Sequence, residues 1–228
     1  MATEKIEING FEHLLYSNSR IGVDALRESR EFYKLMDERR SVRTFSNRPV
    51  DRKVIENIIK TSSTAPSGAH KQPWTFCAVS NPVMKQKIRE AAEKEEQLSY
   101  EERMSERWKD DLKPLATDAN KPFLTVAPYL IIVFKKAYDL DENGEKVNNY
   151  YVNESVGIAS GILITAVHNA GLITLTHTPS PMNFLSELLD RPKNERPFLL
   201  LPIGYPENPS YVPDLKRKPL KDIAVFYE

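Results

Sequence analysis

The residues best suited to chemistry in this chain form two short segments, about two dozen residues apart. The first, Arg39-Arg40-Ser41-Val42-Arg43, places three guanidinium groups and a hydroxyl within five residues. Arginine presents a planar fork of donors that suits phosphate, although adjacent arginines at a helix end are also common on solvated surfaces. The second, Pro66-Ser67-Gly68-Ala69-His70, leads through Gln72-Pro73 into the aromatic and β-branched run 74–79. Together the two segments favour a bound phosphorylated cofactor.

Composition excludes several classes of protein. The 228 residues fit one domain with arms, and 32 acidic against 32 basic residues leave no positive field to recruit nucleic acid. The single cysteine, Cys77, excludes an internal disulfide, and the scattered histidines form no recognisable ligand pair, so we expect no metal site. The N-terminus lacks the pattern of a signal peptide, and no apolar run approaches the ~20 residues that span a bilayer. We therefore expect a cytoplasmic protein with neither a membrane nor a nucleic-acid partner.

Hydrophobic periodicity predicts an α+β fold that positions these segments. A continuous apolar run at 129–134 is typical of a central strand buried on both faces. The helix at 151–170 is apolar nearly all round, with Gly157 and Gly161 on one face, which predicts burial in the core or in a subunit interface. A turn is expected at 141–144. The full set comprises helices at 22–39, 52–61, 82–97, 151–170 and 184–189, and strands at 74–80, 129–134, 172–175 and 198–204.

Three segments are expected to lie outside the compact core. Residues 1–20 show no clear period and residues 206–228 are rich in proline, so we expect an N-terminal arm and a C-terminal arm around a domain at 21–205. The C-terminal arm has too few local partners to fold on itself and is expected to wrap a partner subunit. Residues 98–124 are highly charged and irregular, which predicts a mobile lid at about 91–124.

With these motifs the chain resembles the nitroreductase-like flavoproteins and, among them, the iodotyrosine deiodinase family. The resemblance covers roughly residues 33–223. The arginine segment and Gln72-Pro73-Trp74 are typical of the whole superfamily, whereas two motifs are specific to the deiodinases: Gly68-Ala69-His70 and Pro213-Asp214-Leu215-Lys216-Arg217-Lys218-Pro219-Leu220. The resemblance implies FMN as cofactor, a central mixed β-sheet flanked by helices, and a domain-swapped homodimer with extended arms.

The resemblance also implies roles for the cofactor-binding residues. Thr178, on the segment that lies against the flavin ring, is expected to hydrogen-bond flavin N5 and is the candidate catalytic residue. His177 departs from the family, which has threonine at this position. Ser67 and Gly68 are expected to contact the flavin from the neighbouring subunit. The complete set is Arg39, Arg40, Ser41, Val42, Arg43, Ser67, Gly68, Thr176, His177, Thr178 and Arg217.

Four residues are candidates for reading an amino-acid substrate. Burying a zwitterion requires both a cation and an anion in the pocket. Glu96 and Tyr100 are four residues apart and share one face if their helix extends that far, and Lys121 lies near the far end of the lid. By the resemblance, Glu96 takes the ammonium, Lys121 the carboxylate and Tyr100 a further polar contact, while Ala69 offers its backbone N–H to the phenolate. On charge alone, Glu96 and Lys121 would more often be solvated surface groups.

The function predicted from this set is FMN-dependent reductive dehalogenation of 3-iodo-L-tyrosine and 3,5-diiodo-L-tyrosine, with the lid closing over the substrate. A separate NAD(P)H-dependent reductase is a candidate electron donor. Two alternatives remain open: a general FMN-dependent NAD(P)H nitroreductase or quinone reductase, and a non-catalytic flavin-binding module. Rapid flavin reduction by NAD(P)H alone would mark the first, and a colourless protein unable to take up FMN the second.

Overall fold

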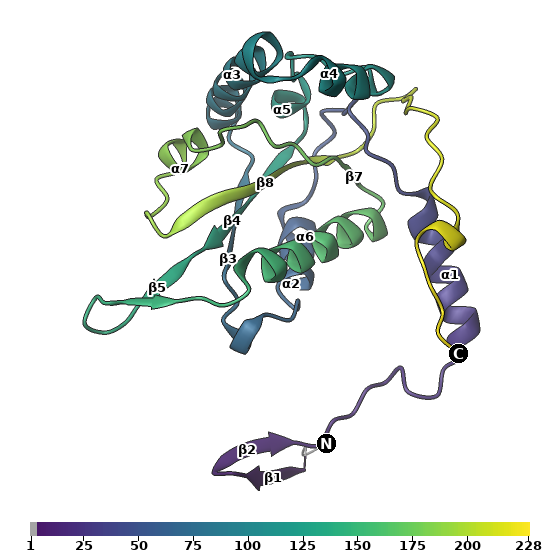
Figure 1. The fold of residues 1–228 in the computed structure, drawn as a ribbon, viewed down its shortest axis with the longest axis vertical. Coiled ribbons are helices and arrows are strands. Elements are labelled where there is room, and N and C mark those ends of the chain that lie inside the picture. The colour runs from purple at the N-terminus through teal and green to yellow at the C-terminus, as the bar shows by residue number, and fades with distance from the viewer. Residues whose placement is uncertain (1–3) are drawn as a thin grey trace. The chain divides into compact units, whose positions relative to one another are not determined.

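The computed structural model describes residues 4–228, which divide into two compact units that meet in the sequence between Glu38 and Arg39. In the first unit, strands β1 (Lys5–Ile8) and β2 (Phe11–Leu14) form an antiparallel hairpin (Figure 1). The connecting residues Asn9 and Gly10 both have positive φ, as two-residue hairpin turns of this kind require. Helix α1 (Ala25–Glu38) completes the unit. The segment predicted as an arm therefore contains a hairpin.

The second unit is built on a four-stranded sheet. Its strands are β3 (Trp74–Val79), β4 (Tyr129–Lys136), β7 (Ile173–Thr174) and β8 (Glu195–Gly204), in the order β3-β4-β8-β7. These strands pair antiparallel, while Ser41 adds a parallel bridge to Thr174, so that both directions occur, as expected of a mixed sheet. Strand β4 lies between β3 and β8 and is buried, as its apolar run predicts.

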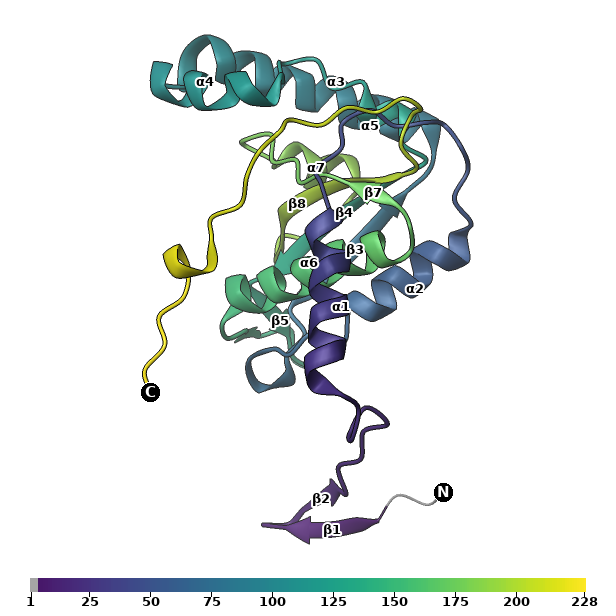
Figure 2. The same cartoon turned by 90° about the vertical axis from the view of Figure 1, so that its right-hand side faces the viewer.

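Helices cover both faces of this sheet, and β4 supplies side chains to each cover. Ile131 and Val133 pack into a cluster with α2 (Arg52–Ser62) and α6 (Val152–Asn169). Leu130, Ile132 and Phe134 point to the opposite face, because alternate residues of a strand do so, and pack with α3 (Pro82–Leu98), α5 (Phe123–Val126) and α7 (Phe184–Leu188). Figures 1 and 2 show the two covers on either side of the sheet. The expected α+β fold with a central sheet flanked by helices is confirmed.

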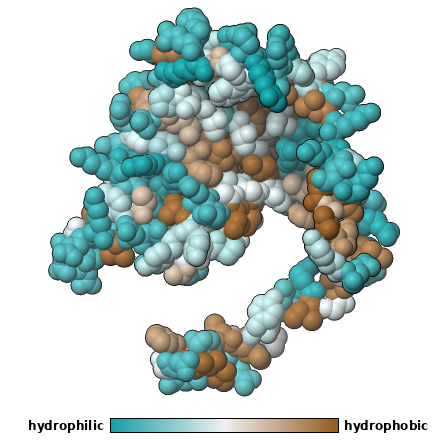
Figure 3. Space-filling model, in the orientation of Figure 1, coloured by the Kyte–Doolittle hydropathy of each residue, from teal (hydrophilic) through white to brown (hydrophobic). Residues whose placement is uncertain are grey.

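The segment predicted to be irregular beyond α3 is largely helical, which corrects that expectation. A π-helical turn spans Ser99–Arg103, helix α4 spans Glu106–Leu112, and a 3-10 turn spans Lys113–Leu115. Helix α4 begins at a regular N-cap, where the Ser105 side chain accepts a hydrogen bond from the Trp108 amide. The outward surfaces of α3 and α4 are strongly hydrophilic (Figure 3). Helix α3 was predicted, whereas the high charge of α4 concealed it from the sequence analysis, since a helix with a small buried face shows little apolar periodicity.

The remaining elements are peripheral. Strands β5 (Tyr138–Leu140) and β6 (Lys146–Asn148) pair around the expected turn, where the Asp141 side chain accepts from two backbone amides. Beyond β8 the chain has a single 3-10 turn, Leu220–Asp222, and the large apolar side chains of this tail are exposed, among them Tyr211, Phe226 and Tyr227. The domain boundaries at residues 20 and 205 stay predictions. Within residues 4–228, no helix is long and apolar enough to cross a membrane.

Helix α6 meets the prediction of burial on one face only. Val156, Ala159 and Leu163 are fully buried, and the Ser62 hydroxyl donates to the Ala159 carbonyl at 2.7 Å. A Cβ atom added at Gly157 or Gly161 would meet no atom of the described chain within 4 Å. The glycine face of α6 is therefore open in this chain.

Candidate active site

The arginine segment is an extended ribbon docked against the edge of the sheet. Ser41 forms a parallel bridge with Thr174, and the Val42 amide donates to the Thr174 carbonyl at 3.4 Å. Val42 is 7% exposed and packs inward, so the alternation of an extended chain directs Arg39, Ser41 and Arg43 to the other side. Docking on β7 thus turns a cluster in the sequence into a row of donors on one surface.

Positive charge is concentrated at the start of this ribbon. The Arg217 guanidinium donates from Nη2 to the Arg39 carbonyl at 3.0 Å, so the C-terminal tail returns to the arginine segment. Burial, then the charges of Arg217 and Arg40, lowers the pKa of Arg39. Within residues 4–228 no carboxylate lies within ion-pair distance of Arg39 or Arg43. A cluster of this kind is stabilised by an anion, and it fits the phosphate of the predicted FMN.

Beside this ribbon lies a cavity of about 240 Å³ between the lid segment and residues 175–178. It combines cationic, anionic and aromatic side chains in one small space, which suits a zwitterion with an aromatic ring. Glu96, Tyr100 and Lys121, separated by up to 25 positions in the sequence, all contribute to its wall. The lining residues are Arg43, Glu96, Ser99, Tyr100, Met104, Trp108, Leu112, Leu115, Thr117, Lys121, Phe123, Leu175, Thr176, His177, Thr178 and Ser180.

Glu96 and Lys121 form a buried ion pair. Lys121 Nζ lies 3.4 Å from Glu96 Oε2, and the two side chains are only 5% and 12% exposed. The ammonium also donates to Thr117 Oγ1 at 3.1 Å and to the carbonyl of Asp118. The alternative that these residues are solvated surface charges is therefore wrong. Because burying an ionised group costs free energy, a buried ion pair in a cavity wall is a candidate for binding a charged ligand.

Tyr100 reaches the same cavity by a different route from the one expected. Helix α3 ends at Leu98, and Tyr100 lies in the π-helical turn that follows, which still directs its ring toward Lys121 at 5.9 Å from the ring centroid. Its hydroxyl donates to the Thr117 carbonyl at 3.1 Å. Burial, then the negative charge of Glu96, raises the pKa of Tyr100, so its phenol stays protonated near neutral pH.

Residues 176–178 form the opposite wall. His177 pairs with Leu200 of β8 through both backbone groups, which gives the segment the alternation of a strand. Thr176 and Thr178 are exposed on one side of the segment, whereas His177 is 6% exposed and points to the other side, toward Glu96. Thr178 is exposed and also contributes to the cavity lining, and its proposed contact with flavin N5 stays a prediction.

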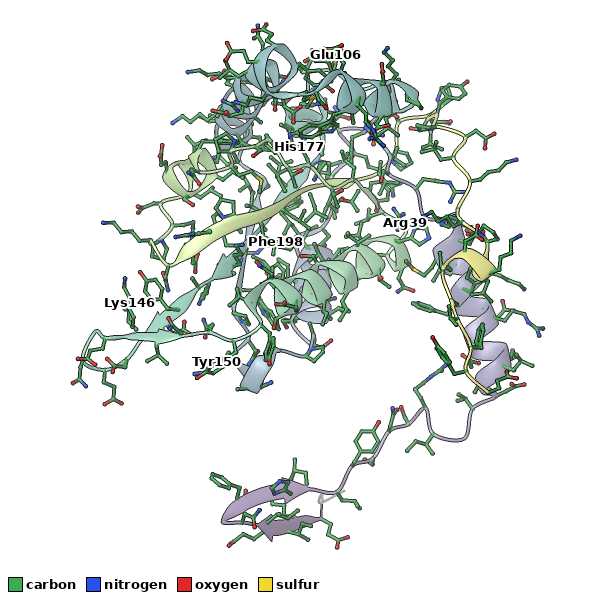
Figure 4. The ribbon with its side chains drawn as sticks, viewed as in Figure 1. Arg39, Glu106, Lys146, Tyr150, His177 and Phe198 are labelled. Atoms are coloured by element: carbon green, nitrogen blue, oxygen red, sulfur yellow. The ribbon has the colours of Figure 1, made fainter. Side chains whose placement is uncertain are left out.

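The loop that carries Ser67, Gly68 and Ala69 does not reach this cavity in the same chain. Gly68 packs against Tyr150, and Figure 4 shows Tyr150 at the end of the second unit far from His177. The loop is tightly wound: Ser67 Oγ accepts from the Gln72 amide at 2.9 Å, and Ala69 has a φ of 49°. In the part of the chain that the structure describes, the Ala69 amide has no acceptor. The loop therefore presents an open donor at a distance from the cavity.

Sequence reasoning missed two residues that shape the cavity. Thr117 accepts from Lys121 and, through its carbonyl, from Tyr100, and thereby joins the two candidates. Its position four residues before Lys121 is the only signal in the sequence. Phe123 places its ring 5.5 Å from that of His177 in an edge-to-face arrangement, and nothing in the local pattern distinguishes it from an ordinary core residue.

A row of arginines beside a cavity with a buried acid and base defines a protein that binds an anionic cofactor together with a small charged molecule. The Nitroreductase family model matches this chain over residues 36–205. The chain therefore belongs to the nitroreductase family.

Relatives and solved structures narrow this assignment. The chain is 61% identical over 204 residues to a protein of Haliscomenobacter hydrossis named iodotyrosine deiodinase, covering 90% of this chain and 92% of that protein. The iodotyrosine deiodinase of Daphnia pulex is 51% identical, over 90% of this chain and 69% of its own length. A crystal structure of oxidized iodotyrosine deiodinase bound to FMN and 3-iodo-L-tyrosine superposes with a TM-score of 0.75 at 31% identity, covering 86% of this chain and 98% of that one. A putative NADH dehydrogenase/NAD(P)H nitroreductase of Bacteroides thetaiotaomicron, at 21% identity and a TM-score of 0.61 over 86% and 96% of the two chains, shares the fold.

Proposed function

We propose that this chain is an FMN-dependent reductive dehalogenase that converts 3-iodo-L-tyrosine and 3,5-diiodo-L-tyrosine to L-tyrosine and iodide. The observation that carries the proposal is the buried pair of Glu96 and Lys121 in the cavity wall. A general reductase of nitro compounds or quinones has no need of opposite charges there, whereas an amino acid requires both. Relatives at up to 61% identity are named iodotyrosine deiodinase, which supports the same assignment.

The cofactor suits the residues that the fold brings together. Four residues of the predicted set would hold the phosphate, the ribityl chain and the pyrimidine edge of FMN: Arg39, Ser41, Arg43 and Arg217. Arg40 and Val42 complete the predicted set. Reduced FMN, when bound, would supply the two electrons that, with one proton, replace the carbon–iodine bond by a carbon–hydrogen bond and release iodide. The side chains of Thr176 and Thr178 would line the flavin ring, with Thr178 donating its hydroxyl hydrogen bond.

The cavity residues bind and orient the amino acid. Glu96 receives the α-ammonium and Lys121 the α-carboxylate, so that the internal ion pair is exchanged for two pairs with the substrate. Tyr100 stays neutral and makes a further polar contact with the substrate through its hydroxyl oxygen. Closing the lid over these charges excludes water and strengthens each interaction.

We propose that two copies of the chain are needed for a complete site. The Ser67-Gly68-Ala69 loop lies away from the cavity of its own chain, so it would serve the cavity of a partner subunit. There Ser67 and Gly68 would contact the flavin, and the Ala69 N–H would stabilise negative charge on the phenolate oxygen. The open glycine face of α6 and the exposed apolar tail residues would be covered in such a homodimer. A separate NAD(P)H-dependent reductase would supply the electrons in a cytoplasmic setting.

Anaerobic turnover tests the function. The FMN-loaded protein is mixed with 3-iodo-L-tyrosine and dithionite, and tyrosine and iodide are measured. We expect stoichiometric release of both, lost in Glu96→Gln and Lys121→Met. Lys109→Met is the matched control, because Lys109 also lies in the lid segment but pairs with Glu106 on the surface. Normal reduction of bound FMN without tyrosine would leave the general reductase, and failure to take up FMN would support the non-catalytic binding module.

A further inference from the structure

His177 is a buried imidazole with a fixed backbone. Its amide donates to the Leu200 carbonyl at 2.9 Å and its carbonyl accepts from the Leu200 amide at 3.1 Å. These two hydrogen bonds fix the backbone, and the ring lies in an edge-to-face arrangement with Phe123 and beside Glu96. Figure 4 shows His177 in the interior between β8 and the helices above it.

The two ring nitrogens of His177 have different surroundings. Nδ1 lies 3.9 Å from Glu96 Oε1, just beyond hydrogen-bond distance. Nε2 is buried and has no hydrogen-bond partner among the described residues. An unsatisfied buried nitrogen destabilises the folded protein, and leucine at this position would avoid that loss. A polar ring held at the expense of stability points to a role in binding.

The charge state of His177 makes its role specific. Burial, then the positive charges of Lys121 and Arg43, lowers its pKa to about 3, so the ring is neutral near pH 7. A neutral imidazole carries one donor and one acceptor. With a carboxylate oxygen facing Nδ1, the favoured tautomer has its proton there, and Nε2 carries the unused lone pair.

The two oxygens of Glu96 have separate neighbours. Oε2 faces Lys121 and Oε1 faces His177. When an amino acid binds as proposed above, Lys121 turns to the substrate carboxylate and leaves Glu96. Glu96 is then free to move the roughly 1 Å that would bring Oε1 from 3.9 Å to an ordinary hydrogen-bond length from Nδ1.

We propose that His177 is a positioning residue that donates a hydrogen bond from Nδ1 to Glu96 in the substrate complex, and so makes the site selective for ligands with an α-ammonium group. This inference rests on the proposed function. His177 orients the Glu96 carboxylate, which in turn binds the α-ammonium group of the ligand. Because the imidazole is neutral, it adds no charge to the site. A cationic side chain at this place would instead compete with the substrate for Glu96.

Ligand binding to the FMN-loaded protein tests the proposal, with quenching of flavin fluorescence as the measurement. The ligands are 3-iodo-L-tyrosine and 2-iodophenol, which lacks both charged groups and makes no use of Glu96. His177→Asn places an amide donor near the position of Nδ1, His177→Gln places one near Nε2, and His177→Leu has none. We expect His177→Leu and His177→Gln to weaken iodotyrosine binding about 10- to 100-fold, as for a lost hydrogen bond to a charged group, and His177→Asn to retain most of it. Binding of 2-iodophenol should change by less than about threefold in all three variants.

Two controls separate positioning from packing. In a Glu96→Gln background, His177→Leu should have little further effect on iodotyrosine, because the two residues act in series. Phe123→Leu disturbs the same packing without removing a donor, and should affect both ligands equally. Thermal unfolding at neutral pH should show His177→Leu to be at least as stable as the wild type, since it removes the unsatisfied nitrogen.

The possible outcomes are distinct. Equal weakening of both ligands in His177→Leu would reduce His177 to a packing residue and overturn the proposal, as would a His177→Asn variant no better than His177→Leu. If instead the wild type binds iodotyrosine no better than 2-iodophenol, the proposed function itself fails. Selectivity in the wild type that is lost only with the Nδ1 donor would establish the role.

Discussion

The buried pair of Glu96 and Lys121 allows a quantitative test by a double-mutant cycle. The variants are Glu96→Leu, Lys121→Met and the combination of the two. Each single change leaves one charge in a cavity wall where its side chain is at most 12% exposed. Removing one partner of a buried pair costs about 3–5 kcal/mol, and Lys121 keeps two neutral acceptors, so we expect about 3 kcal/mol for each single variant.

The double variant should behave differently. Replacing both charges by apolar groups of similar volume is often neutral or stabilising, so the double variant should be close to the wild type rather than about 6 kcal/mol less stable. The coupling energy between the two sites, the difference between the double loss and the sum of the single losses, would then be about 6 kcal/mol. In a protein of this size each kcal/mol shifts Tm by about 2–4 °C, so each single variant should lose about 6–12 °C.

Thermal unfolding followed by circular dichroism measures the cycle, and hydrogen exchange of residues 99–122 detects any loss confined to the lid segment. Binding of 3-iodo-L-tyrosine is measured on the same four proteins. We expect iodotyrosine binding to weaken to the level of 2-iodophenol in all three variants, including the stable double variant, because in the proposed site the two charges bind the charged groups of the ligand. Strictly additive losses of stability, or iodotyrosine binding retained by the double variant, would refute the reasoning.

Three further predictions address other parts of the site. Arg39→Ala and Arg43→Ala should each weaken FMN binding about 10- to 100-fold in a fluorescence titration, as for a lost hydrogen bond to a charged group, and unchanged affinity would exclude them from the clamp. Gly68→Ala adds a methyl group 3.0 Å from the Tyr150 carbonyl oxygen, so thermal unfolding should show a loss of about 1–3 kcal/mol, and an unchanged Tm would show that the loop yields. His177 binds a proton only in the unfolded state between its ordinary pKa of 6.5 and its folded value of about 3, so its share of stability is complete above pH 6.5 and falls as the pH falls. From pH 7 to pH 5 the wild type should lose about 2 kcal/mol that His177→Leu does not lose, and parallel pH profiles would contradict the buried neutral ring.

Much of the fold could be predicted because burial leaves a periodic trace. The apolar run of β4 identified a strand covered on both faces, and α2 appeared at helical spacing. Elements that bury little were harder to find. The N-terminal hairpin and α4 gave no apolar period, although each carries a local signal: Asn9-Gly10 for the turn, and Ser105 as the N-cap.

The candidate site shows where local reasoning ends. The arginine segment is a cluster in the sequence itself, so its suitability for binding phosphate could be predicted from local sequence. The meeting of Glu96 with Lys121 is a consequence of the path of the lid segment, and only the resemblance to a family suggested it. The inward direction of His177 follows from its pairing with Leu200, a residue 23 positions later, and no window of sequence contains that information.

The internal pair explains how the cavity can select a zwitterion. A neutral phenol leaves Glu96 and Lys121 bonded to each other and gains nothing from either charge. A ligand with only a carboxylate takes Lys121 and leaves the Glu96 carboxylate buried with the neutral imidazole of His177 as its donor. A ligand with only an ammonium group takes Glu96 and leaves the Lys121 ammonium with the neutral acceptors of Thr117 and Asp118. Only a ligand with both groups replaces one buried pair by two, so the desolvation that opposes charged ligands is offset for amino acids alone. In the proposed site, selectivity would therefore come from the charged group that each wrong ligand leaves unpaired, and His177 would increase it by holding Glu96 where an ammonium group can reach it.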